Sequence, residues 1–350
     1  MARPQAPSGN TRKLDEVNAW TKKRHEAALE PELPIIDSHH HVWSDRRGRY
    51  LIHELLEDID TGHNIIASIF IEAETMYRAE GPTAMKPVGE VEFANGVAAM
   101  SASGRYGKSR LCAGIIGHAD LTLGDRVQPV LEALIAAGNG RFRGIRHTAT
   151  WDTGDAAKHQ IPRHQSLPHQ ILSPAFRQGF ARLQPLELSF DAWLFYPQLP
   201  ELVDLLSAFP STNVVLTHSG GLLGIPPHDG RRDEVFAIWR GHIRVLAQFP
   251  NLSIKIGGLG MIRCGWDFHL RTVPPPSEDL AAAWRPYVET CIEAFGPSRC
   301  MMESNFPVDK QSCGYGVLWN AFKRITQGCS DAEKGALYRD TAARVYRLAV

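Results

Sequence analysis

Eight short apolar segments alternate with helix-like stretches along the chain. The apolar segments are bounded by turn residues and carry β-branched and aromatic side chains, a pattern that indicates strands. The predicted strands are 33–43, 64–73, 111–120, 142–150, 187–195, 213–220, 252–260 and 299–307. The predicted helices are 50–59, 87–103, 125–137, 174–184, 198–209, 231–249 and 277–296, with two more at 315–327 and 330–348. Eight strands that are each followed by a helix predict an α/β fold, a single (β/α)8 TIM barrel.

Residues 1–30 fall outside this alternation. They are polar and charged, and we interpret them as an N-terminal arm, helical around Leu14–Leu29, that lies outside the core of a barrel spanning 31–350. Residues 151–172 form the longest βα connection, and loops of that length are usually functional or disordered. The other long βα connections are 74–86, 221–230 and 261–276.

Composition narrows the class of protein without naming a reaction. The 38 basic and 38 acidic side chains cancel, so neither nucleic acid nor an anionic membrane surface is an expected partner. No run approaches the roughly 18 apolar residues that a membrane helix needs, and the polar N-terminus lacks an apolar signal core, so a cytoplasmic protein is expected. The six cysteines lack CxxC spacing, which favours reduced structural thiols over disulfides or a thiolate metal site.

Three histidines in the segment IIDSHHHVW, residues 35–43, suggest a metal site. Side chains alternate in a strand, so His39 and His41 share one face while His40 faces the outer layer of the barrel. His218 ends the sixth predicted strand, and a TIM barrel builds its active site at such strand ends. A lone strand histidine is more often structural, but imidazoles that converge on the barrel axis suit a divalent cation. We therefore predict that His39, His41 and His218 bind a metal ion.

Other strand ends supply charged and aromatic groups. Arg146 presents a planar fork that suits a carboxylate. Trp193 and Phe195 either form an aromatic wall for a ring-shaped molecule or simply pack the barrel. The residues predicted to bind substrate are Arg146, His147, Trp151, Tyr196 and Lys255. Together they favour a small, anionic, oxygenated ring compound as the substrate.

Five segments in this order resemble the amidohydrolase superfamily, specifically the amidohydrolase-related branch that includes sugar-acid and dicarboxylate lactonases. IIDSHHHVW resembles the first-strand D-x-H-x-H motif, with His39 and His41 in the ligand places. FRGIRHTAT, VVLTHSGG and SIKIGGL are similar to the fourth, sixth and seventh strands of that branch. MMESNFPVDK is similar to the closing strand, which usually reads G-S-D-W-P. The resemblance covers the chain from about residue 33 to its end.

The closing strand departs from the pattern of the superfamily. The superfamily aspartate that holds the metal and takes a proton from the attacking water falls on Asn305, and an amide cannot act as a base near neutral pH. Glu303 lies two residues earlier, hence on the same strand face, and is the predicted substitute base. Alternatively, Glu303 is a structural ion-pair partner of Arg146 or Lys255. The rival candidates for the base are Asp191 and Asp309. No lysine suitable for carboxylation ends the fourth strand, so the site is expected to be mononuclear.

Three functions remain open on this basis. The leading one is a metal-dependent hydrolase that opens a lactone or related ester of a small carboxylated ring compound, with the metal lowering the pKa of bound water toward about 7. Zinc is the first expectation for the single divalent ion and manganese the second, although some lactonases of this branch work without metal. The alternatives are a lyase (decarboxylase or hydratase) acting on an aromatic-derived or sugar acid, and a degenerate, non-catalytic barrel. The arm and long loops are compatible with a homo-oligomer.

Overall fold

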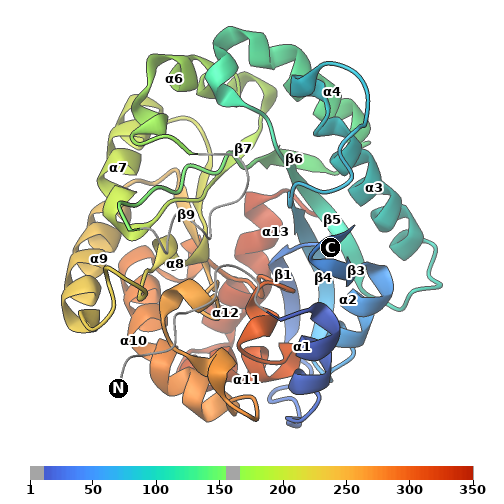
Figure 1. Cartoon of the computed structure of the whole chain (residues 1–350), viewed down its shortest axis with the longest axis vertical. Helices are drawn as coiled ribbons and strands as arrows, with labels where there is room; N and C mark the ends of the chain where they lie inside the picture. The colour runs from blue at the N-terminus through green and yellow to red at the C-terminus, as the bar shows by residue number, and fades with distance from the viewer. Residues whose placement is uncertain (1–11, 155–165, 350) are drawn as a thin grey trace.

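The eight predicted strands form one parallel sheet in the order β1-β4-β5-β6-β7-β8-β9-β10 (Figure 1). The computed structural model describes residues 12–154 and 166–349. The barrel strands are β1 Pro34–His40, β4 Asn64–Ile71, β5 Arg110–Gly117, β6 Phe142–Ile145, β7 Ser189–Ala192, β8 Val214–Leu216, β9 Leu252–Ile256 and β10 Cys300–Met302. The remaining strands are the hairpin pair β2 Trp43–Asp45 and β3 Gly48–Tyr50. The predicted TIM barrel is confirmed, and the polar ends of the predicted strands lie in the βα loops.

Backbone contacts between the first and last strands close the barrel. A parallel bridge joins His40 to Phe306, and the N–H of His41 donates to the carbonyl of Phe306 at 2.8 Å. The N–H of Asn305 likewise donates to the carbonyl of His39 at 2.8 Å. The closure therefore places the histidine segment beside the residues that follow β10.

Helices surround the sheet on the outside of the barrel (Figure 1). Their bounds are α2 Ile52–Ile59, α3 Val88–Ala102, α4 Gln128–Ala137, α6 Pro174–Phe180, α7 Leu199–Ala208, α9 Arg232–Leu246, α10 Ser277–Phe295 and α11 Tyr315–Ile325, with a four-residue turn, α8 His218–Gly221, after β8. Ser173 caps α6, because its side chain accepts from the N–H of Phe176, and Pro174 occupies the first helical position as predicted.

The C-terminal segment closes the end of the barrel where the strands begin. In place of one helix over 330–348, the chain forms α12 Asp331–Gly335, a π-helical turn Ala336–Asp340 and α13 Thr341–Val345. Figure 1 shows α13 at the centre of the barrel, and Tyr346 packs with Ile36 in its apolar interior. The opposite end of the barrel, where the strands finish, is therefore the place for a functional site.

The expectation that the N-terminal arm lies outside the core is wrong for its described part. Helix α1 spans Leu14–Thr21, shorter than predicted, and buries Leu14, Val17 and Trp20 against the rest of the protein. Helix α1 packs against β3, and Leu14 is part of the main apolar cluster. Residues 1–11 lie outside the described structure.

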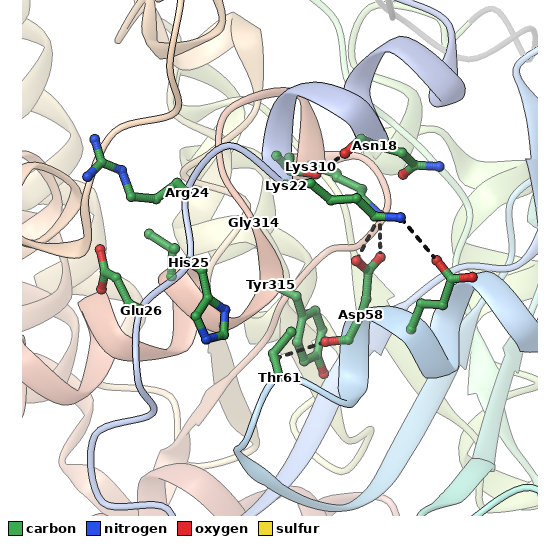
Figure 2. A pocket seen from close by; sticks show the side chains of 14 residues that line it. Asn18, Lys22, Arg24, His25, Glu26, Asp58, Thr61, Lys310, Gly314 and Tyr315 are labelled. Carbon is green, nitrogen blue, oxygen red and sulfur yellow. Dashed lines mark hydrogen bonds and ion pairs between the residues drawn. The ribbon is translucent and has the colours of Figure 1, made fainter.

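A cavity of about 190 Å³ lies between this arm and the barrel. Figure 2 shows the side chains that line it. Lys310 donates to both carboxylate oxygens of Asp58 there, at 2.7 and 2.8 Å. None of the residues predicted to bind metal or substrate lines this cavity. The cavity therefore lies where the arm meets the barrel and not at the ends of the strands.

Two further expectations from the sequence concern the cysteines and membrane-spanning helices. None of the six cysteines forms a disulfide within the described chain, and five of them are buried. Among the described residues, no helix has both the length and the apolar character needed to cross a membrane.

Candidate active site

The histidine segment at the end of β1 presents two imidazoles to one side. The Nε2 atoms of His39 and His41 lie 3.2 Å apart, as strand alternation predicts. His40 points the other way, where its Nε2 lies 2.9 Å from the hydroxyl of Ser68 and its ring lies near Phe70 of the outer layer. The predicted assignment of the strand faces is therefore confirmed.

Glu303 connects this segment to the loop after β8. Its Oε1 accepts from both the backbone N–H and the Nδ1 of His218, at 3.1 and 2.7 Å. Its Oε2 lies 2.9 Å from Nδ1 of His39, as an ion-pair contact without an aligned hydrogen bond. The carboxylate of Glu303 is fully buried, and it lies between the imidazoles of His39 and His218.

The backbone around these groups explains how they fit together. His218 adopts a left-handed conformation, with φ 54°, which is uncommon outside glycine and is often found at functional sites. A Cβ on Gly257 would lie 2.3 Å from Cγ of Glu303, and one on Gly258 would lie 2.6 Å from Nδ1 of His218. The two glycines after β9 are therefore needed because the chain passes directly against the site.

Burial sets the charge state of the cluster. Desolvation raises the pKa of Glu303 to about 8, with Lys255 acting against the rise. Desolvation also holds the pKa values of His39, His41 and His218 well below their usual range, and the nearby Arg146 guanidinium adds to the effect. The imidazoles are therefore neutral near pH 7, which is the form that binds metal ions.

The donor set of this cluster fits a divalent cation. His39, His218 and Glu303 offer donor atoms that all lie within 4.8 Å of one another, and His41 adds its Nε2 beside that of His39. The Nδ1 atoms of these histidines face Glu303 or, for His41, the carbonyl of Ile71 at 2.8 Å. Metal-binding histidines usually direct their second nitrogen to such a carboxylate or carbonyl, which leaves Nε2 for the ion. Glu303 therefore lies on the Nδ1 side of His39 and His218, and their Nε2 atoms are left for the ion.

Arg146 is paired within the protein. Its Nε donates to Oε1 of Glu72 at 2.6 Å, and its Nη2 donates to the carbonyl of Glu72 at 2.6 Å. Its Nη1 lies 3.4 Å from Nε2 of His39. The guanidinium therefore borders the histidine cluster, and its pairing with Glu72 was not predicted from the sequence.

Asp191 and Lys255 lie inside the barrel as a buried ion pair. Nζ of Lys255 donates to Oδ2 of Asp191 at 2.7 Å, and the hydroxyl of Tyr346 donates to the same oxygen at 2.9 Å. Neither side chain has any exposed surface. The structure therefore connects both residues to the closed end of the barrel, and it does not bring them into contact with the histidines.

Asn305 and Asp309 contact each other rather than the cluster. The amide of Asn305 donates to Oδ1 of Asp309 at 2.7 Å, and the N–H of Gly260 donates to Oδ2 at 2.8 Å. Asn305 has a left-handed φ of 54°, and β10 has already ended at Met302. The inference that Glu303 and Asn305 share a strand face is therefore wrong, because alternation requires an extended chain.

The remaining predicted residues surround the site in the βα loops. His147 lies 2.8 Å from the side-chain amide of Gln170 and accepts from the N–H of Leu121 at 3.2 Å. Trp151 is half-buried at the start of the long loop, whose residues 155–165 lie outside the described structure. Tyr196 lies in a hydrogen-bonded chain described below. Trp193, which the sequence left between packing and binding, lies with its ring 4.5 Å from that of His218.

Comparisons with known proteins agree with this geometry. A family model described as amidohydrolase matches residues 36–348. The uncharacterized protein y4mH of Sinorhizobium fredii is 33% identical over 339 residues, which cover 91% of this chain and 99% of that protein. An L-fucono-1,5-lactonase of Burkholderia multivorans is 26% identical and covers 89% of this chain and 96% of its own length. A crystal structure of an amidohydrolase from Burkholderia multivorans with bound zinc has a TM-score of 0.66 at 25% identity, covering 90% of this chain and 99% of that one.

Proposed function

Because the chain belongs to the amidohydrolase family, we propose that it is a hydrolase that opens a lactone, or a related ester, of a small carboxylated ring compound. L-fucono-1,5-lactonases are among its relatives, and this favours a sugar-acid lactone as the substrate. The observation that carries the proposal is the position of Glu303, whose carboxylate lies between the Nδ1 atoms of His39 and His218.

Glu303 is the proposed proton acceptor of the reaction. Oε1 is held by two donors from His218, whereas Oε2 has no aligned donor and retains the capacity to bind a proton. Burial raises the pKa of Glu303 to about 8 in the absence of an ion, and a cation bound at the neighbouring imidazoles would lower it again, so that the carboxylate would be an ionised general base near neutral pH. The rival candidates, Asp191 and Asp309, accept donors on both of their carboxylate oxygens.

A divalent metal ion, with zinc expected before manganese, would be held by the Nε2 atoms of His39, His41 and His218. When bound, it would supply Lewis-acid polarisation of the carbonyl. Glu72 neutralises Arg146 and so limits the repulsion that a cation would meet beside the guanidinium. Once ionised, Glu303 would add a second negative charge at the same place. These residues make the site suitable for an ion and for an anionic substrate.

Arg146 is proposed to orient the substrate through its Nη1 side, by binding the carboxylate of a carboxylated lactone or the oxygens of a sugar-acid lactone. Arg146→Lys should lower kcat/KM by more than about tenfold, roughly 1.4 kcal/mol, because one ammonium cannot hold both Glu72 contacts and reach the substrate. Arg143→Lys is the matched control. Arg143 lies three residues earlier near β6 and donates to the carbonyls of Gly140 and Phe142. Equal kinetics for wild type and Arg146→Lys would remove Arg146 from the substrate site.

The proposed function is tested with a panel of sugar-acid and aromatic-acid lactones, assayed for acid release with added Zn²⁺ or Mn²⁺. We expect acid release from at least one carboxylated or polyhydroxylated six-membered lactone, with L-fucono-1,5-lactone as the first candidate. Release of CO₂ from a carboxylated substrate without ring opening would instead identify a decarboxylase. Binding of lactones without turnover would indicate a non-catalytic barrel.

Metal removal gives a separate expectation. Chelation should reduce hydrolysis to the uncatalysed rate, and one equivalent of Zn²⁺ per chain should restore it, because three neutral imidazoles converge at this site. Metal content measured by elemental analysis before and after chelation is the readout. Full activity in a protein shown to be metal-free would mean that the histidines position the substrate instead.

A further inference from the structure

Three titratable side chains form a hydrogen-bonded chain on the loops that follow β6, β7 and β8. The hydroxyl of Tyr196 lies 2.9 Å from Nδ1 of His228, and Nε2 of His228 lies 3.1 Å from Oδ1 of Asp152. All three residues are buried, with 5% to 8% of their surface exposed. Because a carboxylate only accepts, Asp152 fixes the proton of His228 on Nε2, and Nδ1 then faces the phenol.

The loops are built to hold this chain in one geometry. The second oxygen of Asp152 accepts from the N–H of Gly154 at 2.7 Å. A Cβ on Gly154 would lie 2.3 Å from Cδ of Pro227, so the loop after β6 passes directly against the residue before His228. The N–H of His228 donates to the carbonyl of Ile225 at 2.8 Å. Such constraint is expected of groups that must keep a fixed alignment.

The hydrogen-bonded chain of Tyr196, His228 and Asp152 lies at the same end of the barrel as the histidine cluster. Tyr196 follows Trp193 by three residues, and the ring of Trp193 contacts that of His218. Asp152 follows Arg146 by six residues on the adjoining loop. The phenol thus comes from the loops that adjoin Arg146 and His218, whereas Glu303 approaches from the closure between β1 and β10.

We propose that Tyr196 protonates the ring oxygen that leaves when the lactone opens, and that His228 and Asp152 supply this proton. The inference rests on the proposed hydrolase function and assigns the second proton transfer that ring opening requires. Glu303 receives a proton from the attacking water, and Tyr196 provides one to the departing alkoxide. A group that orients the acid from behind, as Asp152 does for His228, is a common arrangement in proton-transfer sites.

The proton transfers balance over the reaction. In the acid form, His228 is an imidazolium that donates Nε2–H to Asp152 and Nδ1–H to the phenol oxygen, which leaves the phenol O–H directed at the substrate. As the water oxygen bonds to the carbonyl carbon and the ring C–O bond breaks, the alkoxide takes the phenol proton. The Nδ1 proton then passes to Tyr196, neutral His228 regains a proton from solvent, and Glu303 releases to solvent the proton that it took from water. The net reaction is lactone plus water giving the hydroxy acid.

Two lactones with different leaving groups test this role. L-Fucono-1,5-lactone releases an alkoxide that needs a proton, whereas dihydrocoumarin releases a phenoxide that leaves readily without one. Tyr196→Phe and His228→Gln should each lower kcat about 10²-fold or more on the first lactone and less than about threefold on the second. His169→Gln is the control, because His169 forms a comparable histidine–carboxylate pair with Glu201 but is well exposed.

The possible outcomes separate this inference from the proposed function. Hydrolysis of the two lactones by the wild-type enzyme tests the proposed function, and the unequal loss in the variants tests the proton donor. Equal losses on both lactones, or a rise in KM with kcat unchanged, would overturn the role of Tyr196 as acid and leave it as a structural or binding residue. Thermal melting of each variant shows whether the fold is kept, and Asp152→Asn, which keeps the shape of the side chain, should give the same selective loss to a smaller degree.

Discussion

Replacing Glu303 with glutamine is expected to lower kcat by about 10²-fold or more, within the range for loss of a general base. Glutamine has nearly the same shape, but its amide nitrogen cannot accept a proton and would face a ring nitrogen of His39 or His218 as a second donor. Steady-state kinetics on the best lactone, with the melting temperature measured in parallel, checks this result.

Asn305→Asp serves as the comparison for this variant, because it restores the acidic residue that the superfamily carries. The new carboxylate would face Asp309, since the amide of Asn305 donates to Oδ1 of Asp309. Two adjacent carboxylates raise the pKa of one member, so no gain in hydrolysis is expected. If Asn305→Asp increases hydrolysis while Glu303→Gln has wild-type kinetics, then Glu303 is a structural partner of the histidines and the lyase alternative gains support.

The second large effect is expected from the histidines. His39→Ala, His41→Ala and His218→Ala should each abolish measurable hydrolysis, because each removes an imidazole of the one convergent cluster. His40→Ala should keep most of the activity per folded molecule, since His40 faces Ser68 and the outer layer. Its cost should appear in stability, at about 1–3 kcal/mol, because the buried Ser68 hydroxyl would lose its contact with His40 and keep only the N–H of Cys112.

Activity and bound metal measured together for these four variants distinguish the two sides of β1. We expect both activity and bound metal to be lost in the three cluster variants and both to be kept in His40→Ala. If His40→Ala is as inactive as the His39 and His41 variants while its melting curve shows a folded protein, then it is wrong that only the face of β1 with His39 and His41 serves catalysis.

The sequence was sufficient for the barrel because each strand is a local pattern. Alternation also predicted the opposite orientations of His39 and His40, although the pairing of β1 with β4 is irregular between Asp37 and His40. The same rule failed at Asn305, because β10 is only three residues long and the chain then enters a left-handed conformation. Local periodicity cannot show where a short strand ends.

Partners across the barrel were beyond the reach of the sequence. Lys255 and Asp191 belong to β9 and β7, which are not neighbours in the sheet, and their contact depends on the depth of each side chain. The position of Glu303 between His39 and His218 likewise results from barrel closure. The buried arm shows the same limit, because the polar composition of residues 1–30 does not reveal that Leu14, Val17 and Trp20 pack against the barrel.

Oxygen labelling in H₂¹⁸O shows whether water attacks a lactone carbonyl at the Glu303–histidine cluster. Enzyme in excess over lactone is used, the product is examined by mass spectrometry, and Glu303→Gln is the parallel sample. We expect rapid formation of a hydroxy acid with one ¹⁸O in its carboxylate and none in the new hydroxyl, and only the slow uncatalysed product with Glu303→Gln. Label in the hydroxyl, or loss of CO₂ with no ring-opened product, would show that water does not attack the carbonyl at this cluster.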